Sequence, residues 1–310
     1  MSERLSEFDL IAKLLAPLAT SPDAFGLKDD VAMIAPRAGY DLVVTTDAIV
    51  EGLDFFASDP PDTIARKALR VNLSDLAAKG ADPAAYLLTL LLPEKINDDF
   101  LKSFAAGLAQ DQKTFGIALL GGDMSATPGP LSISITAFGH VPKGQIVRRN
   151  GACVDDLVFV TGTIGDSGGG LAQLKSGMHE PSRLIERYRV PEPRIGFAPL
   201  VRVASASIDV SDGLLADLGH IAEASGVRII VEADKIPCSP EVMALWGKDA
   251  IVRAATAGDD YEIAFTSSSQ LYDGQTRVTC IGRVEKGAGV ALIGRGGGEI
   301  DVPRKGFRHF

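Results

Sequence analysis

Residues 67–78 read Lys-Ala-Leu-Arg-Val-Asn-Leu-Ser-Asp-Leu-Ala-Ala and lie in the middle of an alanine-rich stretch. Two prolines precede this stretch and a glycine follows it, so the pattern predicts a helix over residues 62–80. Asn72, Ser74 and Asp75 are poor residues for a helix interior, because their side chains compete for backbone hydrogen bonds. Their grouping within one helix favours a functional role over a structural one.

Asp75 belongs to a set of aspartates in settings of small residues, most of which stand at predicted strand ends or turns. The seven members are Asp29, Asp30, Asp47, Asp75, Asp123, Asp209 and Asp212. If they converged in one cleft, their charges would repel, and some would protonate unless cations lay between them. Hard oxygen ligands of this kind suit magnesium, which a few carboxylates and substrate phosphates usually hold. The alternative is that they are ordinary turn residues.

Composition narrows the class of protein. The chain has 310 residues, of which 46% are hydrophobic, so it can bury a core and suggests roughly two domains. Its net charge is −9 and it has no stripe of Lys or Arg, which argues against a nucleic-acid partner. The three cysteines are far apart, as in a reduced cytoplasmic protein. We expect neither a signal peptide nor a membrane span, because no apolar segment is long enough.

The order of expected elements predicts an α/β protein of two domains, with a boundary near residue 145. The first half gives helices over residues 7–19, 62–80 and 98–115 and strands over residues 41–46, 84–92, 117–120 and 131–141. The second half gives strands over residues 156–161, 207–210, 227–231, 261–265, 277–281 and 290–293, and helices near residue 171 and over residues 194–204 and 214–225. Asp47 and Asp123 would then follow strand C-termini, where open α/β layers carry ligand groups.

Two short motifs in the first half carry polar groups after predicted strands. Thr45-Thr46-Asp47 places two hydroxyls beside a carboxylate, a natural group of hard metal ligands. On its own, such a tripeptide is more often a strand-to-turn junction. Gly121-Gly122-Asp123 would let the backbone approach a phosphate closely, and its alternative is a simple turn.

The second half has its own acidic motif, Asp209-Val210-Ser211-Asp212-Gly213. It places two carboxylates and a hydroxyl ahead of a helix, where backbone N–H groups also bind anions. An N-cap formed by Ser211 or Asp212 is the structural alternative, but it leaves Asp209 unexplained. Arg148-Arg149 is either a phosphate ligand or a solvated pair of loop charges.

Residues 165–169 read Gly-Asp-Ser-Gly-Gly, the string that surrounds the nucleophile of trypsin-like serine proteases. The chain lacks the rest of that machinery, because none of its four histidines has the setting of a protease base. We interpret the string as a glycine-rich turn that opens a helix. The P-loop, the protein-kinase motifs and the dinucleotide fingerprint are also absent from the sequence. A kinase built on this chain would rely on aspartates and metal ions.

In order and spacing, these motifs resemble those of the thiamine-monophosphate kinase family. That family lies in the superfamily of aminoimidazole ribonucleotide synthetase, selenophosphate synthetase and a hydrogenase-maturation enzyme. The resemblance covers nearly the whole chain, and its motifs are Asp29-Asp30 and residues 45–52, 67–78, 121–123, 208–214, 258–262 and 306–310. The terminal cysteines of the selenium and hydrogenase enzymes are missing, which favours the thiamine branch.

The resemblance implies transfer of the γ-phosphoryl group of ATP to thiamine monophosphate, giving thiamine diphosphate and ADP. It implies a two-domain aminoimidazole ribonucleotide synthetase-like fold of α/β class. Residues 1–145 would bind ATP and magnesium and pair in a homodimer, with ATP in the cleft, and residues 146–310 would form an α/β domain. Since the acceptor is already an anionic phosphate oxygen, no general base is required, and alignment with charge neutralisation suffices.

The family also implies roles for individual residues. Several magnesium ions would be held by Asp30, Thr45, Thr46, Asp47, Asp75, Asp123, Asp209 and Asp212. ATP would be contacted by Gly122, Asp123, Arg149 and Ser211. On the acceptor side, Phe307 would stack on thiamine, and Asp54 and Asp259 occupy positions that face the substrate.

The chain departs from the family pattern at three positions. Lys28 replaces a glycine, Asp54 stands where a histidine is usual, and Asp259 replaces a glutamate. Two other functions therefore stay open. One is a sister ATP-dependent synthetase that acts on another acceptor, and the other is a nucleotide-binding protein that has lost its acceptor site.

Overall fold

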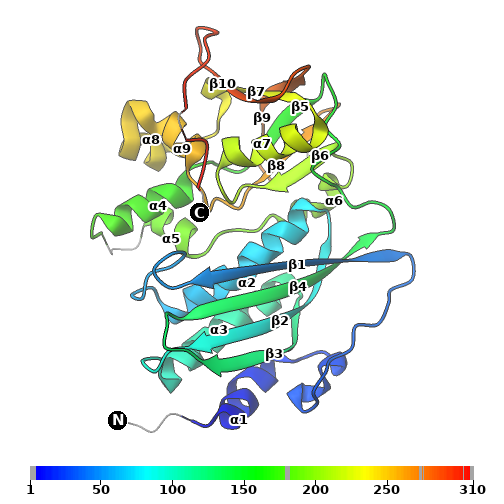
Figure 1. Cartoon of the computed structure of the whole chain (residues 1–310), viewed down its shortest axis with the longest axis vertical. Helices are drawn as coiled ribbons and strands as arrows, with labels where there is room; N and C mark the ends of the chain where they lie inside the picture. Colours follow the sequence, from blue (N-terminus) through cyan, green and yellow to red (C-terminus); the bar gives the residue numbers. More distant parts are fainter. Residues whose placement is uncertain (1–4, 179–181, 272–273, 275, 303, 308–310) are drawn as a thin grey trace. The chain divides into compact units, whose positions relative to one another are not determined.

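The computed structural model (Figure 1) describes residues 5–178, 182–271, 274, 276–302 and 304–307. It divides into two compact units. The first comprises Met1–Leu76 and Asp82–Gly144, and the second comprises Ala77–Ala81 and Gln145–Phe310. Each unit contains its own sheet and helices, which confirms the predicted two-domain α/β class. Within the described residues, no helix is long and apolar enough to cross a membrane.

The first unit is built on a mixed sheet of four strands. The strands are β1 (Tyr40–Val50), β2 (Asp82–Leu92), β3 (Ala118–Ala126) and β4 (Ser132–Pro142), in the order β1-β4-β2-β3. Strand β4 pairs antiparallel with β1 and β2, whereas β2 and β3 run parallel. The long helices α2 (Pro61–Ala78) and α3 (Asp98–Phe115) lie on one face of this sheet (Figure 1).

The two faces of this sheet have different surroundings. Ile133, Ile135 and Ala137 of β4 are buried, while Thr136 and Phe138 alternate with them and line a cavity. The other wall of the cavity comes from the N-terminal segment, which is helical where a helix over residues 7–19 is predicted. That segment consists of α1 (Glu7–Leu10), a π-helical turn (Ile11–Leu15) and the 3-10 turns Ala16–Leu18 and Pro22–Leu27.

Strands β1 and β3 are longer than the sequence predicts. Asp47 and Asp123 lie inside these strands, so the expectation that both follow strand ends is wrong. Asp47 pairs with Ile135 of β4, and Asp123 pairs with Thr89 of β2. Sheet pairing therefore continues through residues whose polar character resembles that of a turn.

The second unit contains a six-stranded sheet in the order β10-β7-β9-β5-β8-β6. Its strands are β5 (Leu157–Thr161), β6 (Ala206–Asp209), β7 (Arg228–Glu232), β8 (Ile263–Ser267), β9 (Val278–Glu285) and β10 (Gly289–Ile293). Its helices are α4 (Asp166–Lys175), α5 (Arg183–Arg189), α6 (Ala198–Val201), α7 (Leu214–Ser225), α8 (Pro240–Trp246) and α9 (Ala250–Thr256). The predicted helix over residues 194–204 is reduced to a 3-10 turn (Ile195–Phe197) and α6. The short helices α5, α8 and α9 are not predicted from the sequence.

The glycine-rich string at residues 165–169 opens α4, as predicted. Gly165 is the N-cap residue of the helix. A Cβ atom on Gly168 would lie 2.4 Å from Cβ of Ala257, and one on Gly170 would lie 2.1 Å from the carbonyl oxygen of Leu184. The glycines thus permit close approach of neighbouring chain segments, which is a role in packing.

Candidate active site

The first group of polar residues in the first unit joins β1 to α2. Oγ1 of Thr45 donates a hydrogen bond to Oδ2 of Asp75 at 2.5 Å. The backbone N–H of Asp47 donates to Oδ1 of Asn72 at 3.1 Å, while Nδ2 of Asn72 donates to the carbonyl oxygen of Ala68 at 3.0 Å. The polar residues inside α2 therefore face β1 and hold it. This explains why they are tolerated within a helix.

The carboxylate of Asp47 lies in a strongly acidic setting. Desolvation of the carboxyl group and the nearby carboxylates of Asp75 and Asp54 raise its pKa to about 6, although the residue as a whole is exposed. Three neighbouring carboxylates repel one another, and their repulsion is unfavourable unless a positive charge offsets it. They suit a divalent cation with hard oxygen ligands.

Asp54 is also part of the turn that follows β1. Its Oδ2 accepts a hydrogen bond from the backbone N–H of Val50 at 2.8 Å. Its carbonyl oxygen accepts from Nζ of the buried Lys67 at 2.7 Å. Asp54 therefore shapes this turn and adds negative charge beside Asp47.

Thr46 faces the side of the sheet opposite to Thr45. It stands opposite Thr136 of β4, whose Oγ1 donates to Oγ1 of Thr46 at 3.1 Å, whereas Thr45 stands opposite the buried Ala137. Adjacent residues of a strand point to opposite faces. The structure thus separates Thr46 from the group formed by Thr45, Asp47 and Asp75.

The cavity on that second face has a volume of about 720 Å³. Its lining combines apolar side chains with five residues singled out from the sequence, namely Asp29, Asp30, Gly121, Gly122 and Asp123. A partly apolar hollow with a few convergent polar groups is typical of a small-molecule site.

Gly122 is required by the path of β3. A Cβ atom at this position would lie 1.7 Å from the carbonyl oxygen of Leu88 on the neighbouring strand. The strand also shifts its register beside this point, between Tyr86 and Leu87 of β2. A side chain would push β3 away from β2 and move Asp123.

The second unit carries the loop between β6 and α7, which contains Ser211, Asp212 and Gly213. Asp209 is the last residue of β6 and is buried. The N-cap of α7 is Gly213, and it makes no side-chain capping hydrogen bond. Neither Ser211 nor Asp212 caps the helix, so the structural alternative for this motif is wrong.

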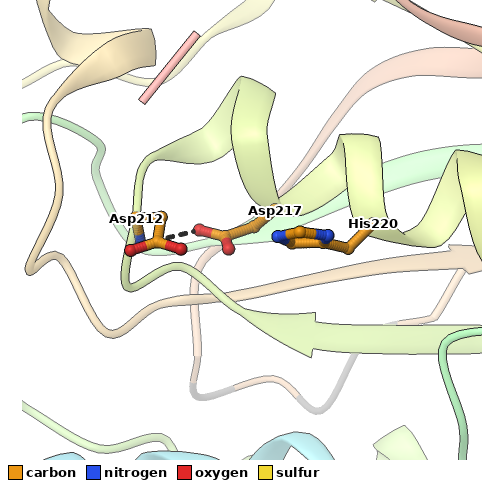
Figure 2. Close-up of side chains that lie close together, drawn as sticks. All are labelled: Asp212, Asp217 and His220. Carbon is orange, nitrogen blue, oxygen red and sulfur yellow. Dashed lines mark hydrogen bonds between the residues drawn. The ribbon is translucent and has the colours of Figure 1, made fainter. Parts of the chain in front are cut away.

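Asp217 in the first turn of α7 organises this loop. Its Oδ2 accepts hydrogen bonds from the backbone N–H groups of Ser211, Asp212 and Gly213 at 3.1, 3.1 and 3.0 Å. Figure 2 shows the Asp217 carboxylate between Asp212 and His220, and one ligand atom of each residue lies within 4.8 Å of the others. Burial and the nearby Asp212 raise the pKa of Asp217 to about 7.

Two later segments of the second unit dock on the same loop. The backbone N–H of Asp259 donates to the carbonyl oxygen of Ser211 at 2.8 Å, and that of Phe307 donates to the carbonyl oxygen of Asp212 at 2.9 Å. Asp259 has a left-handed backbone conformation with φ of 66°. Non-glycine residues adopt this conformation at an energetic cost, and it often marks a functional site. Asp259 and Phe307, the acceptor-side residues that the resemblance implies in the second unit, thus both contact the Ser211–Asp212 backbone.

A buried polar network supports Asp259 from behind. The carboxylate of Asp260 accepts from the N–H groups of Gly165 at 2.7 Å and Ser167 at 3.2 Å. Burial raises the pKa of Asp260 well above its ordinary value. Glu262 is also buried, and it accepts hydrogen bonds from the guanidinium groups of Arg187 and Arg194. This network anchors the segment of residues 258–262 to the start of α4.

The site residues thus form three groups: one between β1 and α2, one at the cavity, and one around the loop between β6 and α7. Arg149 belongs to none of these groups. Arg149 is exposed, and its carbonyl oxygen accepts from Oγ of Ser225 at 3.0 Å. Asp217 and Asp260 are missed by the sequence reasoning. A signal for Asp217 is its place one turn after a glycine that cannot cap a helix with its side chain. Asp260 adjoins Asp259 in the motif, but its burial is not visible from the sequence.

Known proteins resemble this chain over nearly its full length. The family AIR synthase related protein, N-terminal domain, matches residues 28–141, and its C-terminal domain family matches residues 154–294. The chain is 42% identical over 320 residues to the thiamine-monophosphate kinase of Caulobacter vibrioides, covering 98% of this chain and 91% of that protein.

Solved structures of thiamine-monophosphate kinases are also similar to this chain. Thiamine-monophosphate kinase from Stenotrophomonas maltophilia K279a is 40% identical with a TM-score of 0.84, covering 93% of this chain and 96% of that one. The structure of AaThiL complexed with AMPPCP and TMP is 33% identical with a TM-score of 0.82, covering 100% of both chains. The chain therefore belongs to the thiamine-monophosphate kinase family, within the AIR synthase related proteins.

Proposed function

We propose that this protein transfers the γ-phosphoryl group of ATP to thiamine monophosphate, forming thiamine diphosphate and ADP. The observation that carries the proposal is the match over the whole of both chains with AaThiL, which was solved with AMPPCP and TMP. The acidic groups of this chain support the same chemistry, because Asp47, Asp75 and Asp212 are held by hydrogen bonds in their units.

The donor set fits magnesium. Desolvation and the nearby carboxylates of Asp75 and Asp54 raise the pKa of Asp47, and a divalent cation would offset both effects. We assign the magnesium ligands of the first unit to two groups, Thr45, Asp47 and Asp75 on one face of the sheet and Asp30, Thr46 and Asp123 on the other. In the second unit we assign them to Asp209 and Asp212. When bound, magnesium supplies charge neutralisation for the transferring phosphoryl group.

The nucleotide is assigned to the cavity of the first unit. Its apolar lining, including Leu87 and Phe138, suits a base or sugar, and Gly122 allows the backbone to lie close to a phosphate. Asp123 lies at the same wall. Ser211 and Arg149 of the second unit are the further ATP contacts that the family implies.

In the second unit, the acceptor is assigned to Asp259 and Phe307. Phe307 is 49% exposed, so part of its surface is accessible for stacking on thiamine, while its backbone N–H fixes it to Asp212. Asp259 is held beside it through Ser211. Because the attacking phosphate oxygen is already anionic, these residues need to align it and not to remove a proton.

A homodimer through the first unit is part of the proposal. Leu42 and Val44 on the edge strand β1 are 46% and 54% exposed and share one face of the sheet. Exposed apolar side chains on an unpaired edge strand are typical of a surface that a second chain covers. A cytoplasmic location is also a prediction, supported by three cysteines that are all free thiols.

The test is release of ADP with magnesium and thiamine monophosphate, beside controls with thiamine and with no acceptor. We expect ADP only with thiamine monophosphate. ADP release that does not depend on it would favour a sister synthetase with another acceptor. Nucleotide binding without any turnover would favour a protein that has lost its acceptor site.

A further inference from the structure

Asp217 stands outside the residues to which the resemblance gives a role, yet its carboxylate accepts hydrogen bonds from the backbone of residues 211–213. It is 2% exposed and lies in the first turn of α7. One carboxylate oxygen accepts all three successive backbone N–H groups of the loop. These three bonds direct successive N–H groups of the loop to one point and so fix its backbone.

The loop that Asp217 holds is tied on its opposite edge to the acceptor side. The carbonyl oxygen of Ser211 accepts from Asp259, and the carbonyl oxygen of Asp212 accepts from Phe307. The N–H groups of the loop therefore point to Asp217, while its carbonyl groups hold the residues assigned to thiamine monophosphate. Displacing the loop would move both groups at once.

We propose that Asp217 is a positioning residue that fixes the Ser211–Gly213 backbone, so that Asp212 and Ser211 are oriented for magnesium and nucleotide. The inference rests on the proposed function. The N-cap residue of α7, Gly213, has no side chain with which to accept a hydrogen bond from the N–H groups of the loop. Asp217 acts through Asp212 and Ser211 and not on the reacting atoms.

The experiment compares the intact protein with its Asp217→Ala and Asp217→Asn variants. Two quantities are measured without thiamine monophosphate: amide hydrogen exchange at residues 211–213 in the absence of ligand, and calorimetric binding of a non-hydrolysable ATP analogue with magnesium. For Asp217→Ala we expect loss of amide protection and about 10- to 100-fold weaker binding, as is typical when a supporting residue is removed. Asp217→Asn retains an acceptor oxygen and should lose less of both.

Asp156→Ala is the matched control. Asp156 is also buried in the second unit, and its Oδ2 accepts from the backbone N–H of Cys153 at 3.0 Å. This variant should lose local amide protection and leave analogue binding unchanged. A general loss of stability would affect both sites, whereas a positioning role makes only the Asp217 variants bind weakly.

Unchanged analogue binding in Asp217→Ala would overturn the inference. If that variant does not fold, Asp217→Asn decides: faster exchange at residues 211–213 with weaker binding supports the inference, and wild-type values for both overturn it. These outcomes differ from failure of the proposed function. Wild-type protein that binds the analogue but gives no thiamine-monophosphate-dependent ADP would contradict the proposed activity and leave the role of Asp217 standing.

Discussion

Oγ1 of Thr45 on β1 donates a hydrogen bond to Oδ2 of Asp75 on α2, and the two residues are 30 positions apart in the chain. This contact joins the middle of a strand to the interior of a helix. Asp75 also lies close enough to Asp47 for its negative charge to raise the pKa of the Asp47 carboxyl group. The hydroxyl of Thr45 thereby fixes the orientation of a carboxylate that we assign to magnesium.

Asp47→Asn should abolish turnover without unfolding the protein. The amide removes a metal ligand and a repelling charge but leaves the backbone hydrogen bond to Asn72 in place. We expect a loss of kcat of at least about 100-fold, since even supporting residues of metal sites commonly cost 10- to 100-fold, and an unchanged or higher melting temperature.

Asp41→Asn is the control for this change. Asp41 lies on the same strand and accepts a hydrogen bond from the N–H of Gly144 at 2.8 Å. Its variant should retain activity. Full activity of Asp47→Asn would show that the magnesium assignment is wrong.

Magnesium should raise the melting temperature most above pH 6. The folded-state pKa of Asp47 is raised from 3.8 to about 6, so between these values the unfolded chain loses its proton first, and the stability that Asp47 contributes falls as pH rises. Bound magnesium offsets the repulsion once Asp47 is ionised. Below pH 6 the proton competes with the metal ion, and the magnesium-dependent shift should fade.

Thermal unfolding from pH 4.5 to 8, with and without magnesium, checks this expectation. Subtracting the same series for Asp47→Asn isolates the contribution of Asp47 from that of Asp217. A magnesium effect that is independent of pH would contradict the acidic cluster.

Thr45→Val and Thr46→Val should differ in their coupling to Asp75. Thr45 bonds to Asp75, whereas Thr46 bonds to Thr136 on the other face of the sheet. In double-mutant cycles with Asp75→Asn, we expect Thr45→Val to be non-additive in magnesium affinity and Thr46→Val to be additive. Equal coupling of both threonines would place them in one ligand group.

Gly122→Ala should disturb the nucleotide cavity, while Gly121→Ala should be tolerated. The added methyl at Gly122 meets the carbonyl oxygen of Leu88 at 1.7 Å, but at Gly121 it meets only Cδ2 of Leu87 at 3.5 Å, an ordinary contact. We expect a cost in unfolding free energy of about 1–3 kcal/mol for the first variant. Denaturant unfolding and ATP-analogue binding measure it, and equal stability of the two variants would contradict the close approach of β3 to β2.

The sequence predicts the class of fold and most of its acidic positions because these depend on local patterns. The helix around Asp75 is visible from its alanine-rich composition, and its polar residues stand out as exceptions. The extent of β1 is not visible, because pairing with β4 and the hydrogen bond from Asn72 keep Asp47 extended where its own preference is for a turn. Tertiary contacts override local propensity at this point.

The candidate site is less predictable than the fold. Thr45 and Thr46 look like one pair of hydroxyl ligands, and only strand alternation reveals that they face opposite sides. Asp217 resembles any acidic residue in the first turn of a helix, where the helix dipole favours it. Its contacts depend on how the preceding loop folds back, which no spacing rule contains.

The most direct test of the account follows the phosphoryl group itself. Wild-type protein is incubated with magnesium, thiamine monophosphate and ATP labelled in its γ-phosphate, and the products are separated. The account predicts that the label appears in thiamine diphosphate, in an amount equal to the ADP formed. Label found only in inorganic phosphate, at a rate that thiamine monophosphate does not change, would contradict it.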